Sequence, residues 1–416
     1  MQEKKHLIIG CGSAALSALE TIRSVNQEDE IKVVTAEKHP PYSPTALPYL
    51  LSGRIQESNL WMRQETYFKQ LQAVFETGRR AVEIVPERKE VRFHDGSYEK
   101  YDRLLIATGS EPTIPPIKGL DEAGFLGFRT FDDYRSLVQR LEAKRNVTIL
   151  GAGLVGMEVA MGLIEKGYDV NIVARGRILR VYFDAEAEAI IREIFLKQGA
   201  TLVTGHQVGE VKAGLNKLEV ELTNGESLRT DVVVTAMGVK PRTAFLNGSG
   251  IKTENGILVD RNMRTSVADV FAAGDVAEAP DFFTGKPGMN PIIPSAVSQG
   301  KIAGAAMVGE DASYYEGWIP MNVFNFFGNF AFSVGMSTVS RPEYEVFKEV
   351  DEEHRRFRKL VFQGDKLVGA MLANVDADPG TFHYLVRNQV KIGERKEALF
   401  EKPRDIGRWL MLENEK

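Results

Sequence analysis

Cysteine is almost absent from this 416-residue sequence, which contains only Cys11. A single thiol can form neither an internal disulfide nor a CxxC pair, and it cannot hold an iron–sulfur cluster, which generally needs four protein ligands. The six histidines show no H-E-x-x-H spacing, so we predict no metal site. Cys11 itself lies between two glycines, and we interpret it as a small residue packed beneath a turn.

Long apolar runs and a strong charge of one sign are also missing. No stretch has the length of a transmembrane helix, and the N-terminus leads directly into a short apolar run without room for a signal peptide. The net charge of −5 does not indicate the basic surface that is typical of nucleic-acid-binding proteins. We therefore expect a cytoplasmic protein with no membrane span and no nucleic-acid partner. An apolar content of 43% suits two or three domains with full cores.

The N-terminal segment predicts a strand, a tight glycine turn and a helix. Gly10, Gly12 and Ala15 follow a short apolar run in G-x-G-x-x-A spacing. The first glycine allows a sharp turn, the second lets phosphates approach the backbone, and the small third residue packs the helix on the strand. The helix N-terminus then offers free N–H groups to a pyrophosphate. Ile31–Thr35 is the predicted next strand, and Glu37 after it is the expected ribose ligand.

A second and complete fingerprint, G-x-G-x-x-G, consists of Gly151, Gly153 and Gly156 within a strand–helix–strand pattern of the expected length. The residues after its second strand bear on the choice between NAD and NADP. An acid there binds the ribose 2′-hydroxyl, whereas an arginine accommodates a 2′-phosphate. The acid is absent, and Arg175 and Arg177 follow, which favours NADPH. NAD held by other contacts remains the alternative.

Two further strands are predicted to end at a ligand. The apolar segment Leu104–Ala107 ends in a small-residue turn, and Val270–Ala273 ends at Gly274 and Asp275. We expect Asp275 at the start of a helix, where its carboxylate can accept a hydrogen bond from a sugar-like hydroxyl while helix N–H groups hold phosphate. The alternative is an ordinary N-cap aspartate.

The remaining segments are assigned from their residue patterns. Gln64–Phe75 is amphipathic and predicts a helix, whereas Glu111–Gly127 is rich in proline and glycine and predicts a linker. Ser295–Met307 predicts a helix with several small residues. From Asn322 onward the chain is dense in aromatics and predicts strands, followed by a helical tail ending in Trp409–Leu412. That apolar ending is either part of a core or a docking surface for a partner.

The order and spacing of four motifs resemble those of the FAD-dependent pyridine nucleotide–disulfide oxidoreductase superfamily over nearly the whole chain. They are the motif at Gly10, ATGSEP from Ala107, the motif at Gly151, and AAGDV from Ala272. The most similar branches are the NADH oxidase and CoA-disulfide reductase group, the rubredoxin and ferredoxin reductases, and the flavin part of the nitrite reductase large subunit. The resemblance implies an α/β fold with two interleaved Rossmann-like three-layer nucleotide-binding domains and a C-terminal α/β domain. The implied boundaries are 1–112 with 246–320 for FAD, 113–245 for NAD(P), and 321–416 for a C-terminal interface or docking domain.

The same resemblance implies FAD and NAD(P)H as cofactors and places Thr45 and Glu158 at catalytic positions. Relatives that reduce disulfides or peroxide carry a cysteine where Thr45 stands. Ferredoxin reductases carry a lysine where Tyr49 stands, which leaves Glu158 without that partner. The implied FAD contacts are Gly10, Gly12, Ser13, Ala14, Ala15, Glu37, Lys38, Val82, Ala107, Thr108, Gly109, Arg129, Gly274, Asp275 and Ala296, and the implied nicotinamide-nucleotide contacts are Gly151, Gly153, Gly156, Glu158, Arg175 and Gly238.

A threonine hydroxyl cannot act as a redox sulfur, so electrons must leave the reduced flavin for an acceptor outside the chain. We therefore predict an FAD-dependent NAD(P)H oxidoreductase whose partner is an iron–sulfur or rubredoxin-like protein. The ending KPRDIGRWLMLENE is similar to FAD subunits of multi-subunit aldehyde or 2-oxoacid oxidoreductases, in which electrons would run towards NAD(P)+. A homodimer and a hetero-oligomeric complex both stay open. The alternatives are an NAD(P)H oxidase that produces hydrogen peroxide and a non-catalytic flavin-binding scaffold.

Overall fold

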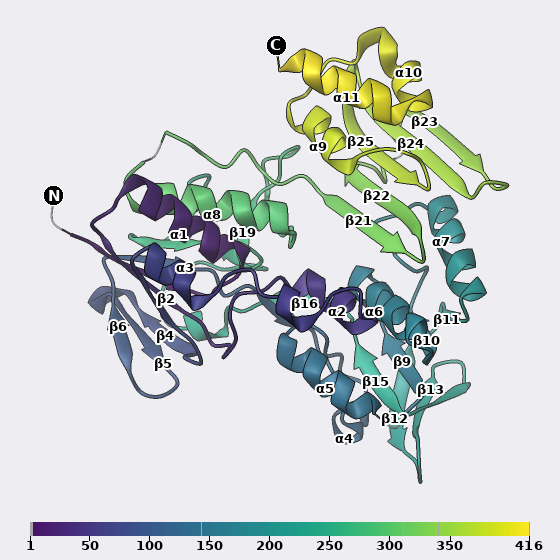
Figure 1. The fold of residues 1–416 in the computed structure, drawn as a ribbon, viewed down its shortest axis with the longest axis horizontal. Coiled ribbons are helices and arrows are strands. Elements are labelled where there is room, and N and C mark those ends of the chain that lie inside the picture. Colours follow the sequence, from purple (N-terminus) through teal and green to yellow (C-terminus); the bar gives the residue numbers. More distant parts are fainter. Residues whose placement is uncertain (1–2, 143, 311, 340, 416) are drawn as a thin grey trace. The chain divides into compact units, whose positions relative to one another are not determined.

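A computed structural model of the chain describes residues 3–142, 144–310, 312–339 and 341–415 (Figure 1). The chain divides into two compact units, each assembled from segments that are distant in sequence. Unit 1 contains Met1–Ala46, Ile55–Glu111 and Val239–Trp318, and unit 2 contains Leu47–Arg54, Pro112–Gly238 and Ile319–Lys416.

Unit 1 is built on a five-stranded parallel sheet in the order β18-β7-β1-β2-β3. Alternate residues of the central strands point to opposite faces, as the two-residue period of a strand requires. Ile8 and Leu105 enter the core under the helices, whereas Leu7 and Leu104 enter a second core on the other face. The strands are β1 (Lys5–Ile9), β2 (Glu30–Val34), β3 (Ala73–Glu76), β7 (Arg103–Ile106) and β18 (Val270–Ala272).

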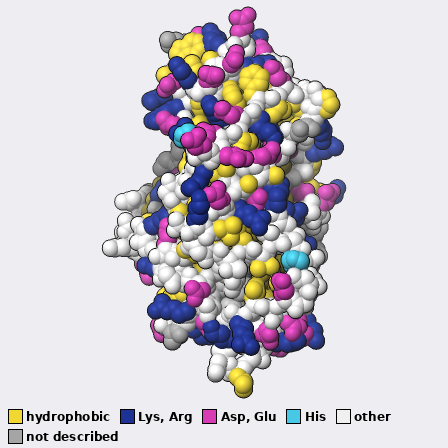
Figure 2. Space-filling view, turned by 90° about the vertical axis from the view of Figure 1, so that its right-hand side faces the viewer, with side chains coloured by type: hydrophobic (Ala, Val, Ile, Leu, Met, Phe, Trp, Pro, Cys, Tyr) yellow, Lys and Arg dark blue, Asp and Glu magenta, His cyan; other side chains and the backbone are white. Residues whose placement is uncertain are grey.

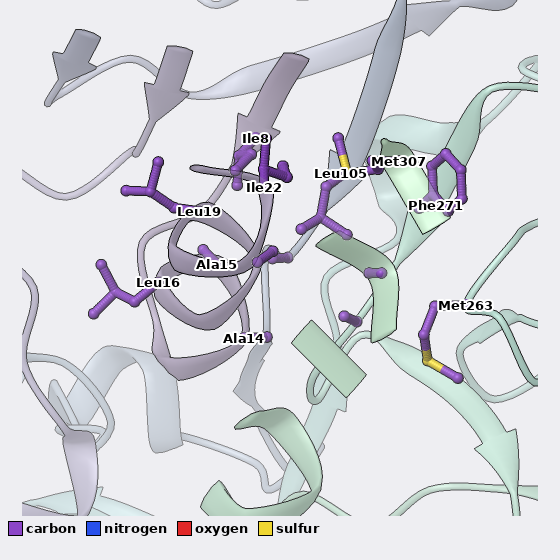
Figure 3. Close-up of a cluster of buried hydrophobic side chains, with 14 of the residues drawn as sticks. Ile8, Ala14, Ala15, Leu16, Leu19, Ile22, Leu105, Met263, Phe271 and Met307 are labelled. Carbon is purple, nitrogen blue, oxygen red and sulfur yellow. The ribbon is translucent and has the colours of Figure 1, made fainter. Parts of the chain in front are cut away.

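The helices α1 (Ser13–Val25) and α8 (Ile293–Met307) cover one face of this sheet (Figure 1), and the antiparallel β4 (Ala81–Val85), β5 (Glu90–Phe93) and β6 (Tyr98–Lys100) contribute to the core on the other. Figure 3 shows the buried cluster to which Ala15 of α1, Leu105 of β7 and Met307 of α8 contribute. Unit 1 thus has three layers, with the parallel sheet between the helices and the antiparallel strands. Its other elements are α3 (Glu65–Gln70), β8 (Ser110–Pro112, which ends one residue beyond the unit), β16 (Val239–Pro241), β17 (Ile257–Leu258), β19 (Ala277–Pro280) and β20 (Pro287–Gly288).

The crossing of α1 and α8 depends on glycine. A Cβ added at Gly300 would lie 2.2 Å from the Ala14 carbonyl oxygen, and one at Gly304 would lie 2.6 Å from that of Ala18. The two helix backbones therefore touch without intervening side chains. This close approach explains the small residues that the sequence places along the 295–307 helix.

Unit 2 contains a four-stranded parallel sheet in the order β11-β10-β9-β15, with α6 following β9 directly. Its helix α2 packs against α6, where a Cβ at Gly162 would lie 3.3 Å from the Pro48 carbonyl oxygen. The elements are α2 (Leu47–Ser52), α4 (Leu120–Ala123), α5 (Phe131–Leu141), β9 (Asn146–Leu150), α6 (Leu154–Glu165), β10 (Asp169–Ala174), α7 (Ala185–Lys197), β11 (Thr201–Thr204), β12 (Val208–Ala213), β13 (Leu218–Leu222), β14 (Ser227–Thr230) and β15 (Val232–Thr235).

The C-terminal part of unit 2 is an antiparallel sheet in the order β21-β22-β25-β24-β23, with three helices after it. Helix α7 packs against this sheet: the Phe195 ring lies 6.1 Å from Phe324 and 5.0 Å from Phe327, centre to centre. The Lys359 ammonium, buried on β24, lies 2.8 Å from the Asp184 carboxylate at the start of α7. The elements are β21 (Met321–Phe326), β22 (Asn329–Gly335), β23 (Glu345–Asp351), β24 (Arg356–Gln363), β25 (Lys366–Ala373), α9 (Pro379–Arg387), α10 (Lys396–Glu401) and α11 (Pro403–Asn414).

Two segment predictions are corrected by the structure. The helix predicted over Gln64–Phe75 ends at Gln70, because Gln72 takes a left-handed φ of 47° and the chain then enters β3. The apolar spacing in that region reflects the Phe68 and Phe75 rings, which stack 4.0 Å apart, centre to centre. The predicted linker Glu111–Gly127 contains the short helix α4.

The surface matches the moderate charge of the sequence. On the face drawn in Figure 2, lysine and arginine side chains are interspersed with acidic ones. Among the described helices, none combines the length and apolar character needed to cross a bilayer.

Replacing Gly300 with alanine tests the contact between α1 and α8. The added methyl group would collide with the α1 backbone, so we expect Gly300→Ala to lower the free energy of unfolding by about 2 kcal/mol, as overpacking of a core does. Lys301→Ala introduces the same residue at an exposed position of the same helix and serves as the control. Equal thermal stability of the two variants would contradict this packing.

Candidate functional site

Both predicted glycine turns begin with a residue that no other amino acid could replace without strain. Gly10 has a φ of 110° and Gly151 a φ of 112°, which side chains rarely adopt. A Cβ at Gly10 would lie 2.1 Å from the Ala107 carbonyl oxygen, and one at Gly151 would lie 2.3 Å from that of Ala236. In each unit, therefore, the turn is pressed against the end of the neighbouring parallel strand.

The second glycine of each turn faces open space, whereas the first is in close contact with backbone. A Cβ at Gly12 or at Gly153 would meet no protein atom within 4 Å. These glycines are the N-caps of α1 and α6, and in both helices no side chain caps the N-terminus and no acid occupies the first turn. The first turn of each helix therefore has no side chain that caps its backbone N–H groups, and this arrangement fits the diphosphate of a dinucleotide.

The third position of each fingerprint packs the helix on its strand, as predicted. Ala15 is fully buried, and Ala14 beside it is nearly so. At Gly156 a Cβ would lie 2.2 Å from the Gly151 carbonyl oxygen. Ser13 opens the first turn of α1 and is partly buried. The two turns thus share one geometry, once in each unit.

Glu37 follows β2 in unit 1, and a tyrosine that the sequence did not mark fixes its carboxylate. The Tyr42 hydroxyl donates a hydrogen bond of 2.6 Å to Glu37 Oε2, and the Gly78 N–H donates one of 3.0 Å to the Glu37 carbonyl. No local spacing relates Tyr42 to the glycine turn, so only the fold could identify it. Of the other predicted contacts nearby, Lys38 is exposed and Val82 lies on β4 with 44% of its surface exposed.

Asp275 lies near the N-terminus of α1. A Cβ at the preceding residue, Gly274, would lie 3.1 Å from the Cβ of Ala14 and 3.8 Å from that of Ala296. The Ser110 hydroxyl donates a hydrogen bond of 2.9 Å to Asp275 Oδ2, and the Gly274 N–H donates one of 2.8 Å to the Gln299 side chain. Ser110 and Gln299 are therefore positioning residues that sequence reasoning missed.

The expectation that Asp275 begins a helix is wrong. Residues 274–276 form a turn between β18 and β19, in which the Ala277 N–H donates to the Gly274 carbonyl at 2.9 Å. The next helix, α8, begins only at Ile293, because β19 first pairs with β17 and β20. The helix N-terminus beside Asp275 is that of α1.

The turn after β7 lies beside the first glycine turn, as the contact between Ala107 and Gly10 shows. The Thr108 hydroxyl donates a hydrogen bond of 3.3 Å to the Arg242 carbonyl, and the Gly109 carbonyl accepts one of 3.0 Å from the Arg242 N–H. Arg129, which the resemblance assigned to the flavin, belongs to unit 2, whereas the other predicted FAD contacts belong to unit 1.

Thiol chemistry has no support in the structure. Thr45 is exposed, and its hydroxyl lies 2.8 Å from that of Ser43. Burial, followed by the charge of Glu37, raises the pKa of the Cys11 thiol well above its usual range, so the reactive thiolate does not form at neutral pH.

Glu158, on α6 in unit 2, is a half-buried carboxyl. Burial raises its pKa to about 7, and no described residue forms a hydrogen bond or an ion pair with it. Burial and then the charge of Glu158 raise the pKa of Tyr182, a residue that the sequence did not mark. Tyr49 has a different neighbour, the Arg54 guanidinium, 6.0 Å from its ring centre. Glu158 and Tyr182 thus form a half-buried pair in the unit that carries the second glycine turn.

The other predicted nucleotide contacts of unit 2 lie at strand ends. Arg175 follows β10 and is exposed, as is Arg177. Gly238 has a φ of 101°, and a Cβ there would meet no protein atom within 4 Å. These residues provide a positively charged loop and an open backbone position at the carboxyl edge of the second sheet.

The two glycines of the second turn predict different defects. We expect Gly151→Ala to destabilise unit 2, because its methyl group would overlap the Ala236 carbonyl and its φ is strained. Gly153→Ala should fold normally and keep its flavin, but should bind nicotinamide nucleotide at least roughly tenfold more weakly, since the methyl group blocks the diphosphate. Thermal unfolding and nucleotide titration separate the two effects. Normal affinity in Gly153→Ala would contradict the assignment of this turn.

The raised pKa of Glu158 predicts a pH-dependent stability. The folded state holds this proton up to about pH 7, whereas the unfolded chain loses it near pH 4.5, so the wild-type free energy of unfolding should fall as pH rises through this window. Glu158→Gln is neutral at every pH. Its gain in stability over wild type should therefore be greater at pH 8.5 than at pH 5.5. The control Glu165→Gln, on the same helix, should show no such increase. Thermal unfolding at the two pH values measures this difference in stability. Parallel pH profiles of stability for wild type and Glu158→Gln would contradict the prediction.

Comparisons with known proteins agree with this geometry. Residues 4–300 match the family model described as pyridine nucleotide-disulphide oxidoreductase, and residues 320–378 match the rubredoxin NAD+ reductase C-terminal domain. The first match contains both glycine turns, and the second begins just before β21.

Similar proteins include the NADH-dependent phenylglyoxylate dehydrogenase subunit epsilon of Aromatoleum evansii, which is 37% identical over 99% of this chain and 98% of its own length. An NADH oxidase of Methanocaldococcus jannaschii is 32% identical over 74% of this chain and 71% of its own. The structure of an NAD-dependent persulfide reductase from A. fulgidus superposes with a TM-score of 0.84 at 26% identity, covering 93% of this chain and 77% of that one. The two dinucleotide-type turns and these matches make the chain an oxidoreductase that uses FAD and NAD(P)H. It belongs to the pyridine nucleotide-disulphide oxidoreductase family.

Proposed function

We propose that this protein is the FAD subunit of a larger oxidoreductase, in which it passes electrons between a nicotinamide nucleotide and an iron–sulfur or rubredoxin-like protein. The observation that carries this proposal is the combination of two uncapped glycine turns, one in each unit, with the absence of a reactive thiol. When bound, FAD supplies hydride exchange with the nicotinamide and release of single electrons.

In unit 1 the chain's own residues hold the flavin nucleotide. The first-turn N–H groups of α1 bind its diphosphate, and Gly12 leaves the space that the phosphates need. Glu37, fixed by Tyr42, accepts hydrogen bonds from the adenosine ribose. Asp275, held by Ser110, accepts a hydrogen bond from a hydroxyl of the flavin's sugar-like chain.

In unit 2 the first turn of α6 binds the nicotinamide nucleotide in the same way. Glu158 lies four residues after Leu154, the first residue of α6. A protonated carboxyl donates a hydrogen bond, whereas a carboxylate only accepts one. With a pKa of about 7, Glu158 can do either near neutrality, and we assign it the role of orienting the nicotinamide end of the nucleotide.

Because the chain offers no redox-active thiol, the electrons must pass to an acceptor outside it. Thr45 stands where a redox cysteine would be needed, and Cys11 is partly buried with a raised pKa. The match to a rubredoxin reductase C-terminal domain supports a small redox protein as partner. A relative that matches 99% of this chain is by name a dehydrogenase subunit, which supports a hetero-oligomeric assembly with clusters on other subunits.

A second candidate is an NAD(P)H oxidase that reduces oxygen directly to hydrogen peroxide. Its support is the similarity to the archaeal NADH oxidase, which extends over 74% of this chain. A flavin-binding scaffold without activity has less support, because both glycine turns keep the geometry that nucleotide binding requires.

Stopped-flow reduction of the flavin under anaerobic conditions distinguishes these functions. We expect NADH or NADPH to bleach the FAD-loaded protein within seconds, and a ferredoxin or rubredoxin to reoxidise it at least roughly tenfold faster than air-saturated buffer. Reoxidation by oxygen that is as fast as by either protein would favour the oxidase. Gly153→Ala is the matched control, since it should keep FAD and need at least roughly tenfold more nucleotide for the same rate of reduction. If neither NADH nor NADPH bleaches the flavin, the non-catalytic flavin-binding scaffold is the function that remains.

A further inference from the structure

A buried cation connects the C-terminal sheet of unit 2 to the loop between β10 and α7. Lys359, on β24, is 3% exposed, and its ammonium donates a hydrogen bond of 2.8 Å to Asp184 Oδ2. Among the described residues, Asp184 is its only ion-pair partner. Buried pairs often add little stability over apolar residues of similar volume, and their best-attested role is to fix one arrangement of the chain.

Asp184 is the last residue of that loop, and its backbone is held as well as its side chain. Its N–H donates to Met371 Sδ on β25 at 3.3 Å, and its carbonyl accepts a hydrogen bond of 2.9 Å from the Glu188 N–H in α7. Met371 is fully buried. The end of the loop is therefore positioned on the C-terminal sheet by both a charged and a backbone contact.

The middle of the same loop is held against the second glycine turn. The N–H of the buried Leu179 donates a hydrogen bond of 2.8 Å to the carbonyl of Ala152, which lies inside that turn. The Leu179 carbonyl accepts hydrogen bonds from the Tyr182 and Phe183 N–H groups at 2.9 and 3.1 Å. A continuous series of contacts therefore runs from Lys359 through the loop to the glycine turn.

We propose that Lys359 is a positioning residue for the nicotinamide-nucleotide site: through Asp184 it fixes the loop that holds the second glycine turn, and so it raises the affinity of that turn for the nucleotide. The inference rests on the proposed function, in which this turn receives the diphosphate. It makes the sheet that matches the rubredoxin NAD+ reductase C-terminal domain part of the support of the nucleotide site.

Removal of the cation should weaken nucleotide binding. We expect Lys359→Met to raise the dissociation constant for nicotinamide nucleotide about twofold to tenfold, because the loop loses one of its two fixed positions. In stopped-flow reduction of the FAD-loaded protein, the nucleotide concentration at half-maximal rate should rise by the same factor, while the rate at saturation should stay unchanged. Lys348→Met is the matched control, since Lys348 forms a partly exposed ion pair with Glu186 between the same sheet and the same helix.

A double variant separates positioning from stability. Lys359→Met leaves the Asp184 carboxylate unpaired and should lower the thermal stability, whereas Lys359→Met combined with Asp184→Asn leaves no unpaired charge and should be close to wild type in stability. If the pair positions the loop, the double variant still binds nucleotide as weakly as Lys359→Met. If Lys359 only stabilises the fold, the affinity recovers together with the stability, which would contradict the proposal.

Calorimetric titration of NADP+ and NAD+ into the FAD-loaded proteins, with thermal unfolding of the same samples, measures these quantities. If neither nucleotide binds wild type, the proposed function fails and this inference fails with it. If wild type binds and the double variant binds equally well, the inference fails while the function stands. Weaker binding in Lys359→Met and in the double variant, with Lys348→Met unchanged, supports it. Should Lys359→Met not fold, the double variant alone decides.

Discussion

The contact between a glycine turn and the end of the neighbouring parallel strand is the constraint on which the rest of this structure depends. Gly10 meets the Ala107 carbonyl and Gly151 meets that of Ala236, each too closely for any side chain. These contacts fix the direction in which α1 and α6 begin, and so they fix where the free N–H groups point. The uncapped helix start that could receive an anion is thus, in both units, a consequence of backbone packing.

The surroundings of each turn then give the two units different chemistry. In unit 1 the carboxylates of Glu37 and Asp275 are hydrogen-bonded by Tyr42 and Ser110, which suits them to accept hydrogen bonds from hydroxyl groups. In unit 2 the half-buried carboxyl of Glu158 has no such partner among the described residues, and burial raises its pKa to about 7. One backbone arrangement is therefore combined with different carboxyl chemistry in the two units.

The sequence predicted the family, the α/β fold class and the glycine turns because these depend on local spacing. It misplaced the helix after Asp275 and overextended the helix at Gln64–Phe75, because strand pairing with distant segments decides both. Tyr42, Ser110 and Gln299 could not be predicted, since each reaches its partner through the folded chain and carries no motif. The domain boundaries and the roles of individual site residues remain predictions.

The central claim is that one chain holds two separate dinucleotide sites, and binding stoichiometry tests it most directly. The flavin content of the native protein and the binding of NADP+ or NAD+ to it can be measured on the same sample by absorbance and equilibrium dialysis. We predict one FAD and one nicotinamide nucleotide for each chain, with no release of FAD as the nucleotide saturates. Displacement of FAD by the nicotinamide nucleotide, or a chain that binds only one of them, would contradict the account.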